Sequence, residues 1–294
     1  MSDPDHPRPE RPSHLSRAAA GRIGPPPPPP PARTVVAVCS GKGGVGKSTV
    51  ALNLAVALAA GGERVGLLDA DVHAPDIPLM VGLARRRPST SWMLSRPGGF
   101  GTTPLEPVER YGVQLMSSGF IVAEDQALAW TAGLAEALLT QLIWSTRWDR
   151  PDHLVVDLPP GISHLVQALF RLVPTARALF VVTPQDVAHL DTRRVLTALR
   201  AADVTVLGAV ENMSGLRCPH CGHDMEVFPP VDHERSIWAN GVERLAVVPL
   251  APVGGDDGPE PVVSTAPDSP RGTALRALAG TVRRAVEEPD AAES

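Results

Sequence analysis

The sequence predicts a three-layer, doubly wound α/β fold built on one mostly parallel sheet. Short apolar runs alternate along the chain with stretches long enough to form helices, which is typical of parallel strands covered by helices on both faces. Several of the apolar runs end in a carboxylate or another polar residue. Because ligands of such folds bind at the carboxyl ends of the strands, polar chemistry is expected along that edge of the sheet.

The predicted elements follow one another in a regular order. Strands are expected at residues 35–39, 64–69, 113–117, 152–157, 178–182, 206–210 and 245–249. Helices are expected at residues 48–60, 128–144, 163–172, 191–202 and 273–287. Residues 84–112 are rich in Gly, Pro, Arg and Ser and are predicted to form a long loop.

The chain divides into three segments by composition. Residues 1–33 include the run Pro25–Pro31 and are predicted to be a disordered proline-rich tail, since such a run cannot build a packed core. A docking site for a proline-binding module is the alternative for this tail. Residues 34–288 are predicted to form the folded domain, and residues 289–294 a short acidic tail.

Charge and cysteine content limit the partners and the compartment. The 294 residues carry a net charge of −5, which argues against general nucleic-acid binding. No secretory signal and no run long enough to span a bilayer is present, so no membrane partner is expected. The three cysteines, too few for a disulfide framework, fit a reducing cytoplasm.

A glycine-rich segment follows the first predicted strand and opens a helix. It matches the P-loop pattern G-x-x-x-x-G-K-[ST], whose backbone N–H groups surround a polyphosphate at a helix N-terminus. Within it, Lys47 is expected to reach the β- and γ-phosphates and Ser48 to bind Mg²⁺. The predicted nucleotide-binding residues of this segment are Gly41, Lys42, Gly43, Gly44, Val45, Gly46, Lys47, Ser48 and Thr49.

Two predicted strands end in aspartates beside this loop. The second strand leads into Asp69 and Asp71, and a later one ends at Asp157 before Pro-Pro-Gly. Carboxylates at this edge lie where Mg²⁺ and an attacking water must be, and Asp157 follows the Walker B pattern. The alternative for each aspartate is capping or solvation of its own turn.

A C-x-x-C pair lies at Cys218 and Cys221, within Cys-Pro-His-Cys-Gly-His. Thiolates at this spacing can converge on one metal, but an ordinary site or cluster needs four ligands. Either the pair faces its twin across a two-fold axis, or His220 or His223 completes a zinc site. A free dithiol or a disulfide is the third alternative.

The loop also carries Lys42 directly after Gly41, and this resembles the deviant P-loop of the MinD/ParA/ArsA group of ATPases. The resemblance implies a homodimer in which Lys42 reaches the partner's nucleotide, Asp71 positions water and Asn212 hydrogen-bonds adenine. The implied catalytic residues are Lys42, Lys47, Asp71 and Asp157.

Taken together, the motifs resemble the Mrp/ApbC family of iron–sulfur cluster carrier ATPases. They are Ser40–Thr49, Leu67–Val72, Asp157–Gly161, Thr183–Ala188, Val210–Ser214 and Cys218–Gly222. The resemblance implies a homodimer with ATP and Mg²⁺, in which Cys218 and Cys221 of both subunits hold a [4Fe–4S] cluster for apoproteins. Ser48 and Asp157 would hold Mg²⁺.

Three segments depart from the pattern of that family. Gly161–His164 reads Gly-Ile-Ser-His where Gly-Thr-Gly-Asp is usual, and Trp130–Leu134 and Val231–Arg235 also differ. These changes predict a slow or altered ATPase. Two alternatives remain. One is a MinD/ParA-like positioning ATPase, and the other is a regulatory ATPase in which the C-x-x-C pair binds a structural zinc or undergoes redox chemistry.

Overall fold

A computed structural model describes residues 29–83, 104–121, 131–218, 220–250 and 260–287. Its centre is a nine-stranded sheet with the order β3-β4-β2-β5-β1-β6-β7-β8, and β9 also pairs with β7. The parallel strands are β1 (Thr34–Cys39), β2 (Val65–Asp69), β4 (Val113–Ser117), β5 (His153–Asp157), β6 (Arg177–Val182), β7 (Val206–Arg217) and β9 (Arg244–Leu250). The predicted α/β fold is therefore confirmed.

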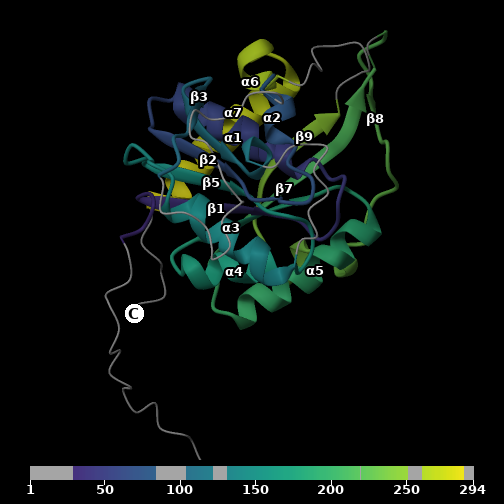
Figure 1. Ribbon diagram of the computed structural model, residues 1–294. Helices are drawn as coiled ribbons and strands as arrows, with labels where there is room; N and C mark the ends of the chain where they lie inside the picture. The colour runs from purple at the N-terminus through teal and green to yellow at the C-terminus, as the bar shows by residue number, and fades with distance from the viewer. Residues whose placement is uncertain (1–28, 84–103, 122–130, 219, 251–259, 288–294) are drawn as a thin grey trace, which may run out of the picture.

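Helices cover both faces of the sheet (Figure 1). On one face, α1 (Lys47–Ala60) packs against α7 (Pro270–Glu287) and the short α6 (Val262–Thr265). On the other lie α3 (Ala132–Trp144), α4 (His164–Leu172) and α5 (Asp186–Ala201). The short α2 (Ile77–Met80) follows β2. Short 3₁₀ turns complete the described elements: η1 (Ser118–Phe120), η2 (His233–Arg235) and η3 (Trp238–Asn240).

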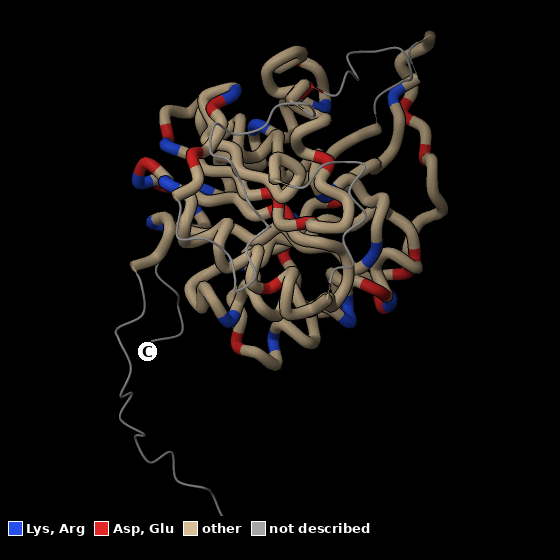
Figure 2. Tube along the Cα trace, in the orientation of Figure 1, with Lys and Arg blue, Asp and Glu red and all other residues tan. Residues whose placement is uncertain are grey.

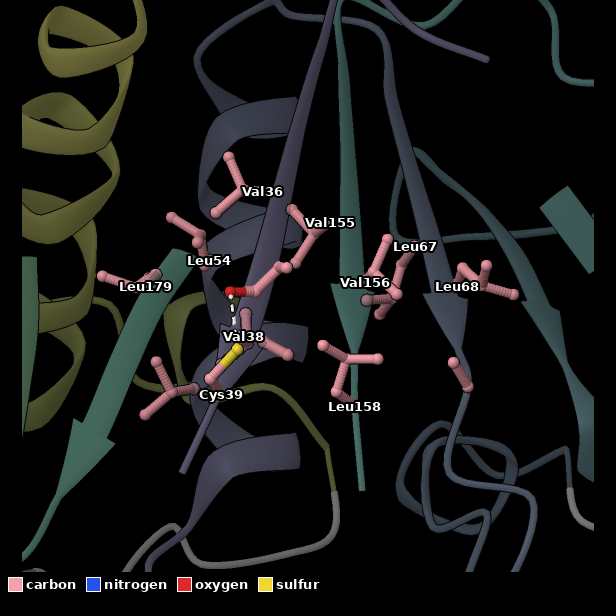
Figure 3. Close-up of a cluster of buried hydrophobic side chains, with 14 of the residues drawn as sticks. Val36, Val38, Cys39, Leu54, Leu67, Leu68, Val155, Val156, Leu158 and Leu179 are labelled. Carbon is pink, nitrogen blue, oxygen red and sulfur yellow. Dashed lines mark hydrogen bonds between the residues drawn. The ribbon is translucent and has the colours of Figure 1, made fainter. Parts of the chain in front are cut away.

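The core lies between these layers and consists mainly of Val, Leu and Ala from the central strands and from α1. Figure 3 shows Val36, Val38, Val155 and Val156 from neighbouring strands packed with Leu54 of α1. All of these side chains are buried, which is why the strands read as continuous apolar runs. This rigid core fixes the loops at the carboxyl edge of the sheet.

Several predicted boundaries need correction. Residues 108–110, predicted as loop, form β3 (Val108–Arg110), which pairs antiparallel with β4. Strand β7 continues to Arg217 rather than ending at residue 210, because its polar second half pairs with β9 and with β8 (Asp224–Met225). Helix α5 begins at Asp186, five residues before the predicted start, since Gln185 is the extended residue at its N-cap.

Some predictions fall outside the described residues. These are the tail up to residue 28, most of the predicted loop at 84–112, the first residues of the helix predicted at 128–144, and residues 288–294. Ala32 is buried, and the Arg33 N–H donates to the Pro151 carbonyl, so contacts with the domain begin just before β1. Acidic and basic residues are mixed around the domain (Figure 2). Among the described helices, none has the length and apolar character needed to cross a membrane.

Candidate functional site

Two elements bring a lysine and an aspartate together at the carboxyl edge of the sheet. Lys47 is the first residue of α1, and Asp157 ends β5. The Lys47 Nζ donates to Asp157 Oδ1 at 2.6 Å, with the two side chains only 7% and 1% exposed. Burial raises the pKa of Asp157, and the charge and hydrogen bond of Lys47 oppose that rise. The pair is therefore a buried salt bridge at the base of the P-loop.

The second oxygen of Asp157 is the observation that fits a bound cation. Asp157 Oδ2 is buried, and within the described chain it has no hydrogen-bond partner. An unpartnered carboxylate oxygen in such a place is costly unless a ligand or water completes it. Hydrogen bonding by the nearby Ser48 hydroxyl also lowers the pKa of the same carboxylate, after the larger effects of burial and Lys47. A hydroxyl and a carboxylate are the protein oxygens that hold Mg²⁺ beside phosphates, so these two residues fit the predicted metal.

Asp69 is as fully buried as Asp157 and holds the loop after β2 in place. It pairs with Asp157 across β2 and β5 and is fully buried. Its Oδ2 accepts the hydroxyl of Ser117 at 2.9 Å and the N–H of Ile77 at 3.3 Å. Burial, and then the charge of Asp157, raise the pKa of Asp69 well above its ordinary value. Asp69 thus connects the loop to β4 and the start of α2.

Asp71, the predicted water-positioning residue, caps its own turn. Its Oδ1 accepts the N–H groups of His73 and Ala74, both at 3.3 Å, and the residue is 8% exposed. This is the capping role that the sequence left open as an alternative. The charge of Asp71 still reaches the site, because it contributes to the raised pKa of Asp157. A role for Asp71 in catalysis stays a prediction.

The glycines of the P-loop differ in the space around them. A Cβ on Gly41 would collide with the backbone of Thr192 in α5, whereas one on Gly43 would meet only a side-chain atom of Pro160 at 4.0 Å. Gly44 and Gly46 have φ values of 79° and 83°, in the left-handed region that favours glycine. The loop conformation therefore needs glycine at specific positions, whereas Gly43 is held to glycine neither by a close contact nor by a left-handed φ.

Lys42 lies on the surface side of the same loop and is half-buried. Its Nζ donates to Gln185 Oε1 at 3.3 Å, at the N-terminus of α5. The sequence singled out the segment that contains Gln185 but assigned this glutamine no role. A lysine held by one neutral side chain at the surface can turn toward another acceptor at low cost. The predicted reach of Lys42 to a partner nucleotide remains a prediction.

The loop after β5, whose residues depart from the family pattern, is held by local hydrogen bonds. Gly161 has a φ of 75° and its N–H donates to the Ser40 carbonyl at 2.8 Å, next to the P-loop. The Ser163 hydroxyl accepts the N–H of Val166 at 3.2 Å and caps α4. Ile162 between them is 45% exposed. Of the residues that depart from the family pattern, Ser163 therefore supports the start of α4.

Asn212 of β7 reaches the P-loop although β6 lies between β7 and β1 in the sheet. Its Nδ2 donates to the Val45 carbonyl at 2.8 Å, and the residue is 4% exposed. A Cβ on Gly46 would collide with this same amide nitrogen. The predicted contact of Asn212 with adenine is untested, but its link to the loop is direct.

The C-x-x-C pair lies at the tip of the hairpin formed by β7 and β8, at the margin of the domain (Figure 1). The Cys218 N–H donates to the His223 carbonyl, and the Gly222 N–H donates back to the Cys218 carbonyl. Cys218 is half-buried and Cys221 exposed. Hydrogen bonds from the backbone at Cys221 and His220 lower the pKa of Cys218. In the described part of the chain, no three His, Cys, Asp or Glu side chains converge to hold a metal.

The third cysteine belongs to the core. Cys39 ends β1 and packs beside Val38 and Leu179, and its thiol donates a hydrogen bond to the Ala37 carbonyl (Figure 3). Burial raises the pKa of this thiol to about 12. Such a thiol is neither a ready nucleophile nor a ready metal ligand, which leaves Cys218 and Cys221 as the accessible pair.

Fold and site together define a P-loop nucleotide-binding protein, with its loop between β1 and α1 and its acidic residues at the ends of β2 and β5. Residues 32–283 match the family model described as NUBPL iron-transfer P-loop NTPase, of the ParA class. The chain belongs to this family, and the predicted relationship to iron–sulfur carrier ATPases is confirmed.

Curated relatives support the same assignment. An iron-sulfur cluster carrier protein of Pseudomonas fragi is 41% identical over 74% of this chain and 74% of its own length. The iron-sulfur cluster transfer protein NUBPL of Dictyostelium discoideum is 37% identical over 81% of this chain and 72% of its own. A carrier protein of Haemophilus influenzae is 40% identical, and this chain spans only 56% of its length.

Solved structures show the same fold. A nucleotide-binding protein of Archaeoglobus fulgidus in complex with ADP has a TM-score of 0.62 and 29% identity, covering 88% of this chain and 90% of its own. The septum site-determining protein MinD of Pyrococcus horikoshii, complexed with Mg-ADP, has a TM-score of 0.59 over 85% of this chain and 95% of its own, at 23% identity. The second likeness extends to the fold alone.

Proposed function

We propose that this chain is an ATP-hydrolysing iron–sulfur cluster carrier that acts as a homodimer. Two copies close over ATP and Mg²⁺ and hold a [4Fe–4S] cluster between Cys218 and Cys221 of each copy, for transfer to apoproteins. The accessible C-x-x-C pair on a hairpin beside the P-loop domain carries this proposal. Curated relatives named as carriers support it. Cluster thiolates must stay reduced, so the cytoplasm is the compartment proposed.

A shared cluster follows from the number of ligands. Iron–sulfur clusters of this kind are held by four cysteine thiolates, and one hairpin supplies two. The third cysteine is buried in β1 and its pKa is raised to about 12, so it is a poor candidate. A second copy related by a two-fold axis supplies the same two thiolates again. The exposed position of Cys221 makes such an approach possible.

The nucleotide chemistry proposed here uses the residues at the ends of β2 and β5. Mg²⁺ supplies neutralisation of phosphate charge when bound, and Ser48 and Asp157 are the residues that would hold it. Lys47 leaves its salt bridge with Asp157 and turns to the phosphates. Its positive charge then stabilises the transferred phosphoryl group instead of the carboxylate. Asp71 orients the attacking water once its carboxylate no longer caps its own turn. Catalysis is then mainly positioning and charge stabilisation.

The test is anaerobic reconstitution of the full chain with iron and sulfide. The expected product is a brown dimer with about four irons, and visible absorption should be lost in the double variant Cys218→Ala with Cys221→Ala. Cys39→Ala is the matched control, because it removes a cysteine outside the hairpin and should keep the colour. A colourless wild-type protein that retains zinc, or a double variant that retains its iron, would overturn the proposal.

Hydrolysis is tested separately. The wild-type chain should release phosphate from ATP in the presence of Mg²⁺, and Lys47→Ala should abolish this by weakening nucleotide binding. A rate of phosphate release equal in Lys47→Ala and the wild type would contradict the assigned roles.

A further inference from the structure

Strand β7 connects the two candidate sites within one element. It begins at Val206 beside β6, passes the P-loop at Asn212 and ends at Arg217, directly before Cys218. One strand therefore contacts the P-loop and carries the cysteine hairpin at its end, although the two motifs lie far apart in the sequence. Any displacement of the loop that moves this strand also moves the hairpin.

A buried hydrogen bond joins the P-loop to β7. The Asn212 Nδ2 donates to the carbonyl of Val45 at 2.8 Å, and both residues are buried, with 4% and 2% exposure. Asn212 also fills the space beside Gly46, where a Cβ would collide with its amide. Because the donor is buried against the loop, the loop carbonyl would lose its partner if the strand moved alone.

The bonded carbonyl belongs to a peptide unit of the phosphate-binding loop itself. In a P-loop, backbone N–H groups surround the phosphates, and here the Val45 carbonyl and the Gly46 N–H belong to the same rigid plane. A phosphate that reorients this N–H also turns the carbonyl that Asn212 holds. Gly46, with a φ of 83°, allows that rotation more freely than another residue would.

The strand changes its geometry just beyond Asn212. Met213 has a φ of 59°, which is uncommon for a residue other than glycine, and Gly215 has a φ of 75°. The pairing with β9 shifts register between Asn212 and Leu216. Irregularities of this kind re-aim a strand and are frequent beside functional sites. The segment 213–215 therefore forms a joint, by which we mean a bend in β7 between Asn212 and the hairpin.

We propose that Asn212 is a positioning residue that couples occupancy of the P-loop to the conformation of the Cys218–Cys221 hairpin. Nucleotide binding reorients the Val45–Gly46 peptide, Asn212 transmits the change to β7, and the joint at Met213 redirects the hairpin. The proposal deepens the carrier function and rests on it for one consequence only, the control of cluster release by nucleotide. The mechanical coupling itself requires no cluster.

The first test uses the cluster-free full chain. Amide hydrogen exchange of residues 214–225 is measured with and without Mg-ADP, at ADP concentrations that saturate each variant. In the wild type, Mg-ADP should change these exchange rates at least about threefold. Asn212→Asp, which keeps the shape of the side chain but loses the donor, should abolish the change at full occupancy.

The matched control is Asn53→Asp. Asn53 is another buried asparagine, 2% exposed, and its Nδ2 donates to the Thr49 carbonyl at 2.9 Å. The substitution removes the same kind of hydrogen bond without touching β7, so the hairpin should still respond to Mg-ADP. A wild type without a response, or an Asn212→Asp protein that responds like the wild type at saturation, would overturn the proposal. The latter result would leave Asn212 as an adenine contact or a purely structural residue.

A second variant covers the case in which Asn212→Asp does not fold. Met213→Gly keeps the hydrogen bond to Val45 and loosens the joint, so the response of the hairpin to Mg-ADP should fall by about half or more. An unchanged response in that variant would also contradict the proposed path.

Cluster release then separates this proposal from the carrier function. In reconstituted wild type, transfer of the cluster to a chelator should change rate when Mg-ATP is added, and Asn212→Asp should remove that dependence while keeping its colour. A cysteine-dependent cluster whose release ignores nucleotide refutes the control of release by the nucleotide and leaves the carrier function intact. A wild type that binds no cluster refutes the carrier function, and hydrogen exchange still decides on the coupling.

Discussion

Removing the charge of Lys47 should leave Asp157 as an unpaired carboxylate inside the domain. The two side chains are 7% and 1% exposed and their charged atoms lie 2.6 Å apart. Loss of one partner of a buried pair costs about 3–5 kcal/mol. Asp71 and Asp69 increase the penalty, because each interacts unfavourably with Asp157. We therefore expect Lys47→Met to be strongly destabilised when no nucleotide is present.

Protonation of Asp157 sets an upper limit to that cost and gives it a pH dependence. An aspartate with an ordinary pKa of about 3.9 can be neutralised at pH 7 for about 4 kcal/mol, and at pH 5 for about 1.5 kcal/mol. The folded variant takes up this proton while the unfolded chain does not, so the variant gains stability relative to the wild type as the pH falls. The penalty should thus be about 3–4 kcal/mol at pH 7 and less than about 2 kcal/mol at pH 5.

The assay is urea unfolding of the nucleotide-free protein at both pH values. Lys42→Met is the matched control, since it removes a half-buried lysine from the same loop and should cost less than about 1 kcal/mol. Combining Lys47→Met with Asp157→Asn should recover much of the loss, because the unpaired charge is then gone. A penalty below about 1 kcal/mol at pH 7, or one that is equal at pH 5 and pH 7, would refute this account of the pair.

Three further predictions follow from contacts and burial. Gly41→Ala should lower stability by about 1–3 kcal/mol and weaken ADP binding, because its Cβ meets the backbone of Thr192. Gly43→Ala is the control and should fold normally, and calorimetry compares the two variants. At pH 8 about one molecule in ten thousand carries Cys39 as thiolate, so iodoacetamide should label it only in urea, and labelling of the native protein at this position would contradict its burial. Burial lowers the pKa of His153, so below pH 6.5 the unfolded chain takes up a proton that the folded chain does not bind. His153→Gln should therefore lose less stability than the wild type as the pH falls through that value. Equal slopes of unfolding free energy against pH in urea titrations would count against this.

The parts of the fold that the sequence predicted are those determined by local pattern. The strands ending at Asp69 and Asp157 are continuous apolar runs because helices cover both faces, and their register brings both carboxylates to one edge. The P-loop was predictable because its spacing reflects the geometry of phosphate binding. The family assignment, which the comparisons confirm, came from several such motifs in order.

Other features depend on tertiary contacts, so local sequence patterns did not predict them. The second half of β7 is too polar to be predicted as a strand, and only its pairing with β8 and β9 makes it one. The salt bridge between Lys47 and Asp157 joins residues that are distant in the chain. The hydrogen bond from Asn212 to Val45 has the same origin, since it depends on which strands become neighbours.

The margins of the sheet bear on how copies of this chain can meet. At one side β3 has only three residues, and its Glu109 and Arg110 are exposed; at the other, β9 contains Pro249, which has no N–H to offer. Short, charged or proline-containing outer strands give an incoming strand few backbone groups to pair with. Growth of the sheet from one molecule into the next is thereby discouraged, even at high concentration.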